Sequence, residues 1–541
     1  MYVGDKNRIN VSSSQFADFI EDKNLYVDKT AFVEHILQDA SNVLLFTRPR
    51  RMGKSLNMNM LAAFLDCGKN TAHLFSGLYI ESSPAFARVN KYPVIYLSFR
   101  ELEIDYYKQR FKHNLMEIAD RYLKEEQYSP KLVDYFNDKD DQNTGALMDL
   151  TKNLYSVYGE KPYIVIDEYD KPIMDNIQSP KLPEFKKWIT DIFGSALKDN
   201  PALGKAILTG VTRIAKESMF SNLNNLEVYD VFRHSVYDDD FSLTEQELTE
   251  LMPPDKLPEL RRWYNNVRVG GSLLYNIYSV MSYLRNGCRL DTYWSNTGNM
   301  NILTDLITPS RAEQLSKMLA EAGYGHETPL EPKLDLSLLM SNVDDAYYYS
   351  LAVQAGYLTY TPSDPEPNDR LYKVFIPNME AQSTWKNQIL SNMGLRTHNE
   401  FSGIFDNIEN TGEFDRKLTN FISMKLSYFD TDSGELERTY HVFIFGMMLL
   451  LGYKCTSNLE AGFGRYDILI EAPHFGAVIE FKQSKSQKAL GKDVQAAIKQ
   501  IEDRRYYDAV PERGLPVYKI GIACYKKSCT VKTVLHEYCK N

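Results

Sequence analysis

The sequence lacks the features that mark secreted, disulfide-stapled and membrane-spanning proteins. Its six cysteines are scattered along 541 residues without a Cys-x-x-Cys pair, which favours free thiols in a reducing cytoplasm. The longest apolar run, Val442 to Leu451, is about half of the roughly 20 residues that a membrane-spanning helix needs. The N-terminus has no apolar core of the signal-peptide type. We therefore expect a cytoplasmic protein that has no membrane partner.

An excess of positive charge is also missing. The chain has 62 Lys and Arg against 72 Asp and Glu, a formal net charge of −10, which argues against a generally basic surface for nucleic acid. A local basic groove remains compatible with this composition, because steering depends on where the charges lie. The length exceeds what one hydrophobic core supports and suggests two to four domains.

The first two hundred residues alternate apolar runs with amphipathic stretches. Continuous apolar strands separated by helices are typical of a parallel sheet covered on both faces. This part is therefore predicted to be an α/β domain, with helices at Lys54 to Leu65 and at about Ile104 to Lys124. The four predicted strands are Val43–Thr47, Pro93–Phe99, Tyr163–Asp167 and Lys205–Thr209.

The middle of the chain is predicted to be mostly helical. It opens with Ser242-Leu-Thr-Glu245, which resembles a helix-capping box. Two β-rich runs, Gly356–Tyr360 and Leu371–Phe375, flank a Pro-rich loop and suggest a hairpin, the wing of a winged helix. The acidic run Asp238–Asp240 is predicted to be a solvated loop.

The last part predicts one mixed sheet with helices packed against it. We expect a domain boundary between Pro377 and Gly412 and three domains in all: 1–235, 236–385 and 386–541. The predicted elements of the last domain are a helix at Glu437–Leu451, strands at Tyr453–Ser457, Arg465–Glu471 and Ala477–Lys482, a helix at Leu490–Ala509 and a strand at Val517–Ala523.

A candidate phosphate-binding loop follows the first strand. Such a loop needs backbone N–H groups turned toward the β-phosphate, a lysine for the β and γ oxygens and a hydroxyl for Mg²⁺. Gly53, Lys54 and Ser55 supply these groups between a strand and a helix. Arg48 stands where the first glycine of the motif is usual. The whole loop is Arg48-Pro49-Arg50-Arg51-Met52-Gly53-Lys54-Ser55.

A second acidic motif completes the predicted ATP site. The strand Tyr163–Asp167 ends in Asp167 and Glu168, so Asp167 is expected to hold Mg²⁺ and Glu168 to polarise the attacking water. Thr209, at the end of the fourth strand, is a candidate sensor of nucleotide state. Arg213 is a candidate arginine finger, although an ordinary surface salt bridge explains it equally well.

These motifs resemble those of a bacterial AAA-ATPase-like family of P-loop ATPases. Its members carry Tyr-Val-Asp-Lys-Thr ahead of Thr-Arg-Pro-Arg-Arg-x-Gly-Lys, and this sequence has Tyr26–Thr30 and Thr47–Lys54. The family's loop also lacks the first glycine. The resemblance covers roughly residues 5 to 300 and implies ATP and Mg²⁺ as cofactors, with ring or dimer formation. Further matching segments are Asp167–Pro172, Tyr275-Asn276 and Tyr293–Thr297.

A second constellation lies near the C-terminus. Glu480 and Lys482 share one face of a predicted strand, because side chains alternate along it, and Asp467 lies on the neighbouring strand. Two converging carboxylates suit Mg²⁺, and the lysine would position water and stabilise a phosphorane-like charge. Glu437 on the preceding helix would complete the metal shell, and Gln500 on the following helix would orient substrate.

This arrangement resembles the PD-(D/E)xK nuclease superfamily, in the version fused to the ATPase family above. The name's proline is replaced by Tyr466, and His441 is the weakest correspondence, since a lone helical histidine is more often a core residue. The same acidic and basic residues would also form a plain salt-bridge cluster. The matching residues are Glu437, Tyr440, His441, Glu460, Gly462, Gly464, Arg465, Asp467, Glu480, Lys482, Gln500 and Ile501.

Two functions remain open from the sequence. The first is an ATPase coupled to a Mg²⁺-dependent nuclease that acts on nucleic acid, with DNA favoured. The alternative is a nucleotide-dependent signalling switch that binds a protein partner and has an inert nuclease-like domain. A nuclease would contact its polymer through a local basic patch, whose candidates are Arg465, Lys482, Lys485, Lys488 and Lys492.

Overall fold

A computed structural model gives the structure of the chain. It describes residues 2–536 except 138–142, 215–222, 224, 295–302, 304–305, 308, 321–322, 334–342, 363–370, 393–402, 426–439, 442–443, 449–452, 458–459, 462–463, 512–513 and 527. The chain forms two compact units, which are Met1–Gly298 with Glu327–Ala381 and Asn299–His326 with Gln382–Asn541. Within these described ranges, no helix is long and apolar enough to cross a membrane.

The first unit is built on a parallel five-stranded sheet. Its strands are β3 (Val43–Thr47), β4 (Val94–Ser98), β5 (Tyr163–Asp167), β6 (Ala206–Gly210) and β7 (Leu226–Tyr229). They lie in the order β4-β5-β6-β3-β7, and all neighbours run parallel. The four predicted strands are confirmed to within one residue at each end. Because β6 lies between β3 and β5 and all three strands are parallel, their carboxyl ends lie side by side at one edge of the sheet.

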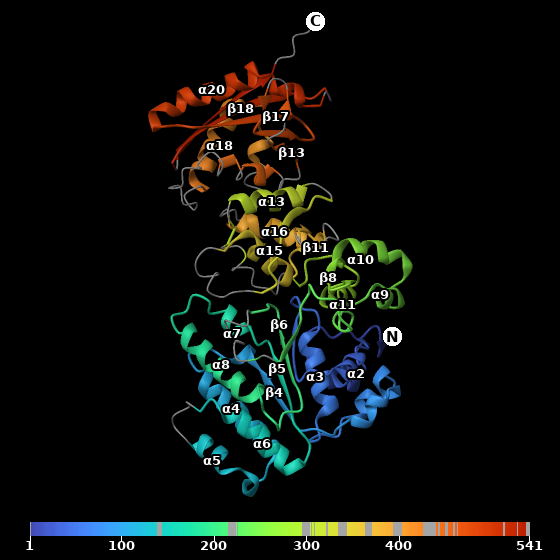
Figure 1. Cartoon of the computed structure of the whole chain (residues 1–541). Helices are drawn as coiled ribbons and strands as arrows, with labels where there is room; N and C mark the ends of the chain where they lie inside the picture. The colour runs from blue at the N-terminus through green and yellow to red at the C-terminus, as the bar shows by residue number, and fades with distance from the viewer. Residues whose placement is uncertain are drawn as a thin grey trace. The chain divides into compact units, whose positions relative to one another are not determined.

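Both faces of this sheet are covered, as the continuous apolar strands predicted. Val43 and Leu45 of β3 pack into one core, whereas Leu44 and Phe46 pack into the other, because successive side chains point to opposite faces. Figure 1 shows α4 (Tyr107–Tyr122), α6 (Ala146–Tyr158) and α8 (Leu182–Leu197) on one side, with α2 (Ala31–Gln38) and α3 (Lys54–Leu65) on the other.

The region after β7 differs in detail from the prediction. The capping box is made by Thr244 and Glu247, two residues later than predicted, at the start of α9 (Glu245–Leu251). A short hairpin of β8 (Val267–Val269) and β9 (Ser272–Leu274) was not predicted. It lies between α10 (Leu257–Tyr264) and α11 (Ile277–Arg285). The hairpin of β11 (Thr359–Pro362) and β12 (Leu371–Phe375) is confirmed, and both strands share a sheet with β10 (His326–Pro329).

The prediction that Asp238–Asp240 is a solvated loop is wrong for two of its residues. Asp238 and Asp240 are both buried. Asp238 accepts hydrogen bonds from the backbone N–H groups of Ser235 and Gly271, and Asp240 contacts His35 Nδ1 at 2.8 Å. A buried carboxylate is tolerated when donors and cations surround it, which a run of three acidic residues does not reveal.

The Tyr26–Thr30 segment makes its contacts in the same region as Asp238–Asp240. Lys29 Nζ binds the Asp239 carbonyl at 2.8 Å and forms an ion pair with Glu247 at 2.6 Å. Asp28 accepts from the backbone N–H groups of Thr30 and Tyr79. The motif therefore fastens the N-terminal segment to the start of α9.

The second unit contains the predicted mixed sheet. Its strands are β13 (Lys454–Ser457), β16 (Ile468–Glu471), β17 (Gly476–Gln483), β18 (Val517–Tyr525) and β19 (Ser528–His536), in that order. Only β17 and β18 run parallel among these neighbours. Sequence reasoning missed β19, and the predicted helix to Ala509 ends earlier, as α20 (Leu490–Asp503). Figure 1 shows α20 along one face of the sheet.

Candidate functional site

The phosphate loop joins β3 to α3 in an unusual backbone conformation. Gly53, the residue before α3, has φ +81° and ψ +11°, and Arg51 has φ +62°. Left-handed residues of this kind turn successive N–H groups toward one side, where they form an anion-binding concavity. The start of α3 adds the positive end of a helix dipole to the same place.

The side chain of Arg48 does not face this concavity. It is fully buried, and its Nη1 donates to the carbonyls of Thr47 and Tyr229 at 3.0 and 2.6 Å. The guanidinium also lies over the Phe241 ring at 5.1 Å. Burial lowers the pKa of Arg48 to about 10, while Asp238, Asp230 and Asp240 oppose that shift. Arg48 thus anchors the base of the loop, and only its backbone belongs to the predicted nucleotide site.

Replacing Arg48 with methionine is expected to lower the free energy of unfolding by about 3 kcal/mol, because the buried Thr47 and Tyr229 carbonyls would lose their donor and nearby carboxylates would lose a cation. Chemical denaturation measures this loss. Arg233→Met is the control, since the Arg233 ion pair with Glu227 is half exposed and worth less than about 1 kcal/mol. Equal stability losses in the two variants would contradict an anchoring role for Arg48.

Lys54 is buried and bound to the loop itself. Its Nζ donates to the carbonyls of Arg48 and Pro49 at 2.9 and 2.7 Å. Burial lowers the pKa of Lys54 to about 8, and the nearby Asp170, Glu168 and Asp167 oppose that shift. The lysine is therefore a cation beside three carboxylates, and phosphate oxygens would replace two carbonyl oxygens around it.

The lowered pKa of Lys54 predicts an alkaline limit to activity. The ammonium loses its proton as the pH rises through about 8, so kcat/KM for ATP should fall about tenfold per pH unit above that value. Steady-state ATPase assays between about pH 7 and 10 measure the profile. In Lys54→Arg the guanidinium keeps its charge to a higher pH than an ammonium does, so the alkaline limit should move to higher pH. A flat wild-type profile would contradict the prediction.

The acidic residues at the end of β5 meet the end of β6. Asp167 is buried, and its Oδ1 accepts a hydrogen bond from Thr209 Oγ1 at 2.7 Å. Glu168 has φ +54°, and its Oε2 is buried without a hydrogen-bond partner among the described residues. Burial and the neighbouring Asp167 raise the pKa of Glu168. A carboxylate with a raised pKa is a better proton acceptor near neutral pH.

Asp170 is a structural residue of this site that sequence reasoning did not assign. It is buried, and its Oδ2 accepts from Val211 N, Thr212 N and Thr212 Oγ1 at 2.7 to 2.9 Å. The preceding Tyr169 donates its hydroxyl to the Thr212 carbonyl at 2.7 Å. Together they fix the segment after β6 against the end of β5. The only signal was the position of Asp170 in the Asp167–Pro172 segment.

Arg213 is engaged within its own chain. Its guanidinium pairs with the buried Asp230, and its backbone N–H donates to Gln354 Oε1 at 2.8 Å. The salt-bridge interpretation of Arg213 therefore describes this conformation. Its role as an arginine finger stays a prediction.

Arg51 holds a strained backbone conformation in the phosphate loop. A left-handed backbone costs a residue with a Cβ about 1–2 kcal/mol. The Arg51 guanidinium lies over the ring of Tyr278 at 4.6 Å, and an exposed cation–π contact of this kind contributes about 0.5–1 kcal/mol. Backbone strain of this kind is typical of functional sites.

The residues around the loop fit ATP and Mg²⁺ chemically. Ser55 offers a hydroxyl in the first turn of α3, and Asp167 offers a carboxylate at the end of β5. Oxygen ligands of this kind are the ones Mg²⁺ prefers. Lys54 and the left-handed loop suit phosphate, and the buried Glu168 Oε2 suits a water.

The C-terminal site differs from the prediction in one strand boundary. Asp467 precedes β16 rather than lying within it. The β16–β17 register pairs Ile468 with Ile479, which places Asp467 opposite Glu480. Asp467 Oδ2 accepts from Phe481 N at 2.7 Å, and Lys482 Nζ donates to Glu480 Oε1 at 2.9 Å. Burial raises the pKa of Asp467, so a cation beside it would be favourable.

The helices around this site differ in what they contribute. His441 Nε2 donates to the Asp467 carbonyl at 3.0 Å, so it supports the backbone there. Gln500 lies half-buried on α20. This helix passes close to Gly521, the partner of Glu480 on β18, where a Cβ would lie 2.8 Å from the Val494 carbonyl. Glu437 lies outside the described residues.

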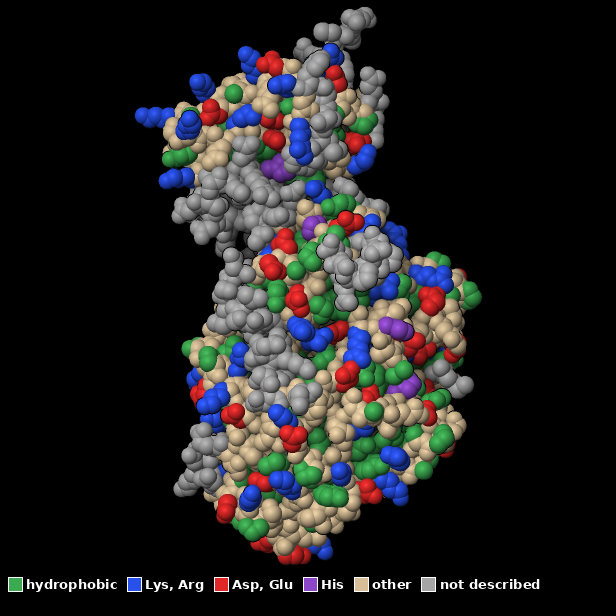
Figure 2. All heavy atoms as spheres, viewed as in Figure 1, with side chains coloured by type: hydrophobic (Ala, Val, Ile, Leu, Met, Phe, Trp, Pro, Cys, Tyr) green, Lys and Arg blue, Asp and Glu red, His purple; other side chains and the backbone are tan. Residues whose placement is uncertain are grey.

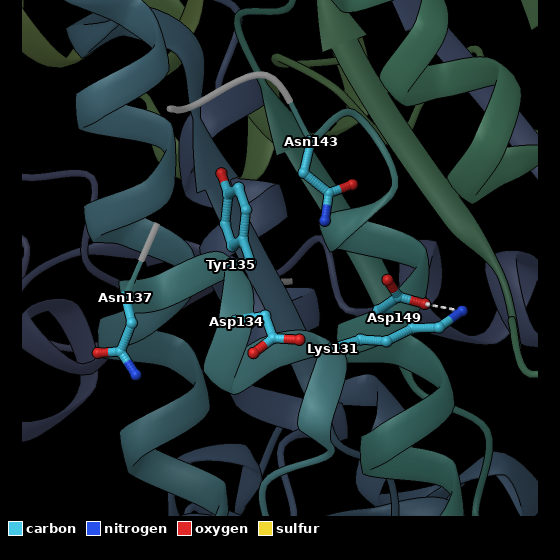
Figure 3. Close-up of a pocket in the computed structure, with 6 residues that line it drawn as sticks. All are labelled: Lys131, Asp134, Tyr135, Asn137, Asn143 and Asp149. Carbon is cyan, nitrogen blue, oxygen red and sulfur yellow. Dashed lines mark ion pairs between the residues drawn. The ribbon is translucent and has the colours of Figure 1, made fainter. Parts of the chain in front are cut away.

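Two further observations concern metal binding and the position of a cavity. Within the described part of the chain, no group of three or more His, Cys, Asp or Glu could hold a metal ion, and the predicted third carboxylate, Glu437, lies outside that part. A cavity of about 550 Å³ near α5 (Pro130–Asn137) and α6 contains none of the predicted site residues (Figure 3). It is lined by Lys131, Asp134, Tyr135, Asn137, Asn143 and Asp149.

Comparisons with known proteins give two family matches. Residues 10–220 match the model described as "Predicted AAA-ATPase", and residues 435–534 match the PD-(D/E)XK nuclease superfamily. Both resemblances drawn from the motifs are confirmed by these matches. Together with the observed sheets, they also confirm the predicted α/β fold class.

Similar proteins add little about function. An "uncharacterized protein in vnfD 5'region" of Azotobacter chroococcum mcd 1 is 26% identical over 550 residues. The match covers 97% of this chain and 98% of the length of that protein. A structure of the Aeropyrum pernix Orc1 protein in complex with DNA is 12% identical, with a TM-score of 0.24. It covers 70% of this chain and 98% of its own.

Proposed function

We propose that this chain, which carries an AAA-ATPase-like domain at residues 10–220 and a PD-(D/E)XK nuclease superfamily domain at 435–534, hydrolyses ATP and couples it to Mg²⁺-dependent cleavage of nucleic acid. The observation that carries the ATPase is the position of β6 between β3 and β5. This order brings the ends of β3, β5 and β6 together and supports a site made of Lys54, Thr209, Asp167 and Glu168. The proposed functional parts are 1–235, 236–385 and 386–541.

The ATPase step follows from these residues. The left-handed loop and Lys54 hold the β- and γ-phosphates, while Thr209 fixes the orientation of Asp167. Glu168 accepts a hydrogen bond from water and takes its proton as the oxygen attacks the γ-phosphorus, while the bond from the γ-phosphorus to the β–γ bridging oxygen breaks and ADP leaves. Magnesium, held by Ser55 and Asp167, would neutralise phosphate charge when bound. As an arginine finger, Arg213 would have to leave Asp230 and reach the ATP bound to a neighbouring copy of the chain. The proposal therefore includes ring or dimer formation.

Cleavage of nucleic acid would take place beside Glu480 and Lys482 of β17. Water adds to the phosphorus of a phosphodiester, the P–O ester bond breaks, and the leaving oxygen takes a proton. Lys482 would orient that water and stabilise the developing charge, and Gln500 would orient substrate. Asp467 and Glu480 would hold Mg²⁺, with Glu437 as a proposed third ligand. Magnesium would supply a Lewis acid for the phosphoryl oxygens.

The nucleic acid would contact a local basic patch, defined by Arg465, Lys482, Lys485, Lys488 and Lys492. Arg465, Lys485, Lys488 and Lys492 are exposed, whereas Lys482 is half-buried. Figure 2 shows Lys and Arg side chains projecting from the surface of the C-terminal domain. Binding through such a patch weakens steeply with salt, since phosphate contacts release counterions. DNA is the favoured polymer.

One observation favours the second candidate, a nucleotide-dependent switch with an inert nuclease-like domain. Lys482 forms an ion pair with Glu480, as it would in a plain salt-bridge cluster. The experiment that separates the two is cleavage of labelled single- and double-stranded DNA and RNA with Mg²⁺ or Mn²⁺, with and without ATP. Cleavage that depends on Lys54 supports ATP-gated nuclease activity. Intact ATPase activity with no cleavage and no salt-dependent DNA binding supports the switch.

A further inference from the structure

Arg51 stands in the phosphate loop where a glycine would be less strained. Its φ of +62° lies in the left-handed region, and its side chain is exposed. Burial or dense packing therefore does not impose this conformation. The guanidinium nevertheless folds over the face of Tyr278, 4.6 Å from the ring centre. The loop thus holds a cation beside its own anion-binding concavity.

Tyr278 is held in place by the start of α11. Asn276, the residue before this helix, donates from Nδ2 to the Arg50 carbonyl at 3.2 Å. Its Oδ1 accepts from Ser279 N at 3.2 Å, and Ile277 N donates to Ser242 Oγ at 3.0 Å. The first turn of α11 is consequently fastened to the phosphate loop one residue from Arg51. A change in the loop would be felt by this helix.

We propose that Arg51 contacts the terminal phosphate of a bound nucleoside triphosphate, and that Tyr278 holds its guanidinium in the conformation seen here. The inference rests on the proposed ATPase function and names a residue that would distinguish ATP from ADP. A guanidinium binds phosphate through charge-assisted, often bidentate hydrogen bonds. Such a pair is stronger than an exposed cation–π contact, so ATP would draw the guanidinium away from Tyr278.

The consequence is a direct link between nucleotide state and α11. With ADP, the guanidinium would stay on Tyr278 and hold the helix against the loop. With ATP, that contact would be exchanged for the γ-phosphate, and α11 would keep the Asn276 bond to Arg50. The backbone strain at Arg51 is then the cost of having an arginine, rather than a glycine, at the position that reaches the phosphate.

The test is Arg51→Gly, because a purely structural role predicts no loss from it. Glycine adopts the left-handed backbone readily, so the melting temperature should match or exceed that of the wild type. ATP affinity, measured by calorimetry in the presence of Mg²⁺, should fall roughly tenfold, the usual effect of losing a charged hydrogen bond. ADP affinity should change less than about twofold. Tyr278→Leu removes the competing contact and should tighten ATP binding about threefold.

Arg505→Gly is the matched control, since Arg505 is also an arginine with a left-handed backbone, at φ +53°, but lies outside the loop. It should bind both nucleotides as the wild type does. Equal losses of ATP and ADP affinity in Arg51→Gly, or no loss of either, would overturn the inference. A wild-type chain that bound neither nucleotide would instead refute the proposed function, and this inference with it.

Discussion

Replacing Glu168 with glutamine is expected to reduce ATP turnover by roughly a hundredfold to ten-thousandfold, the range that a general base contributes. ATP binding should persist, because Lys54 and the left-handed loop are untouched. The reason lies in the carboxylate itself, whose Oε2 is buried without a hydrogen-bond partner in the described structure. An amide of the same shape cannot accept the proton of the attacking water.

The measurement is phosphate release under single-turnover conditions, alongside equilibrium ATP binding. Glu160→Gln is the control, since Glu160 is exposed ahead of the same strand. The raised pKa of Glu168 also implies an acid limb, because the base must be deprotonated and activity falls as the pH drops through that pKa. If Glu168→Gln hydrolysed ATP at the wild-type rate, another residue would have to be the base.

Glu480→Gln is expected to reduce the rate of nucleic-acid cleavage by about a thousandfold or more. Glu480 is buried, accepts from Lys482 at 2.9 Å and lies opposite Asp467 by register. Removing its charge would weaken Mg²⁺ binding and leave Lys482 without its carboxylate. A metal ion stabilises the transition state by several kcal/mol, and about 4 kcal/mol corresponds to a thousandfold in rate.

Cleavage of the labelled polymers should be compared for wild type, Glu480→Gln and Glu502→Gln, purified in parallel. Glu502 lies half exposed on α20, paired with Lys519, so its loss controls for a changed charge on the same domain. Nucleic-acid binding at low salt should persist in Glu480→Gln, because the basic patch is intact. Cleavage that survived unchanged in Glu480→Gln would point to a contaminating nuclease or to another site.

The sequence was most informative where function depends on neighbouring residues. The strand–loop–helix from Val43 to Leu65, with Gly53, Lys54 and Ser55 in the loop, follows from local hydrophobic pattern and from the needs of phosphate. The same is true of Asp167 and Glu168 at the end of β5. In the last domain, the face shared by Glu480 and Lys482 follows from alternation along β17, which extends one residue beyond the prediction at each end.

Tertiary structure decided what depends on residues far apart in the chain. The burial of Arg48 requires the Tyr229 carbonyl and the Phe241 ring, about 180 to 190 residues away. Asp238 and Asp240 are acceptable inside the protein only because backbone donors and cations meet them there. The link from Arg51 to Tyr278 arises from how α11 packs on the loop. Local periodicity carries no record of such long-range partners, since each segment satisfies its own pattern whichever partner it meets.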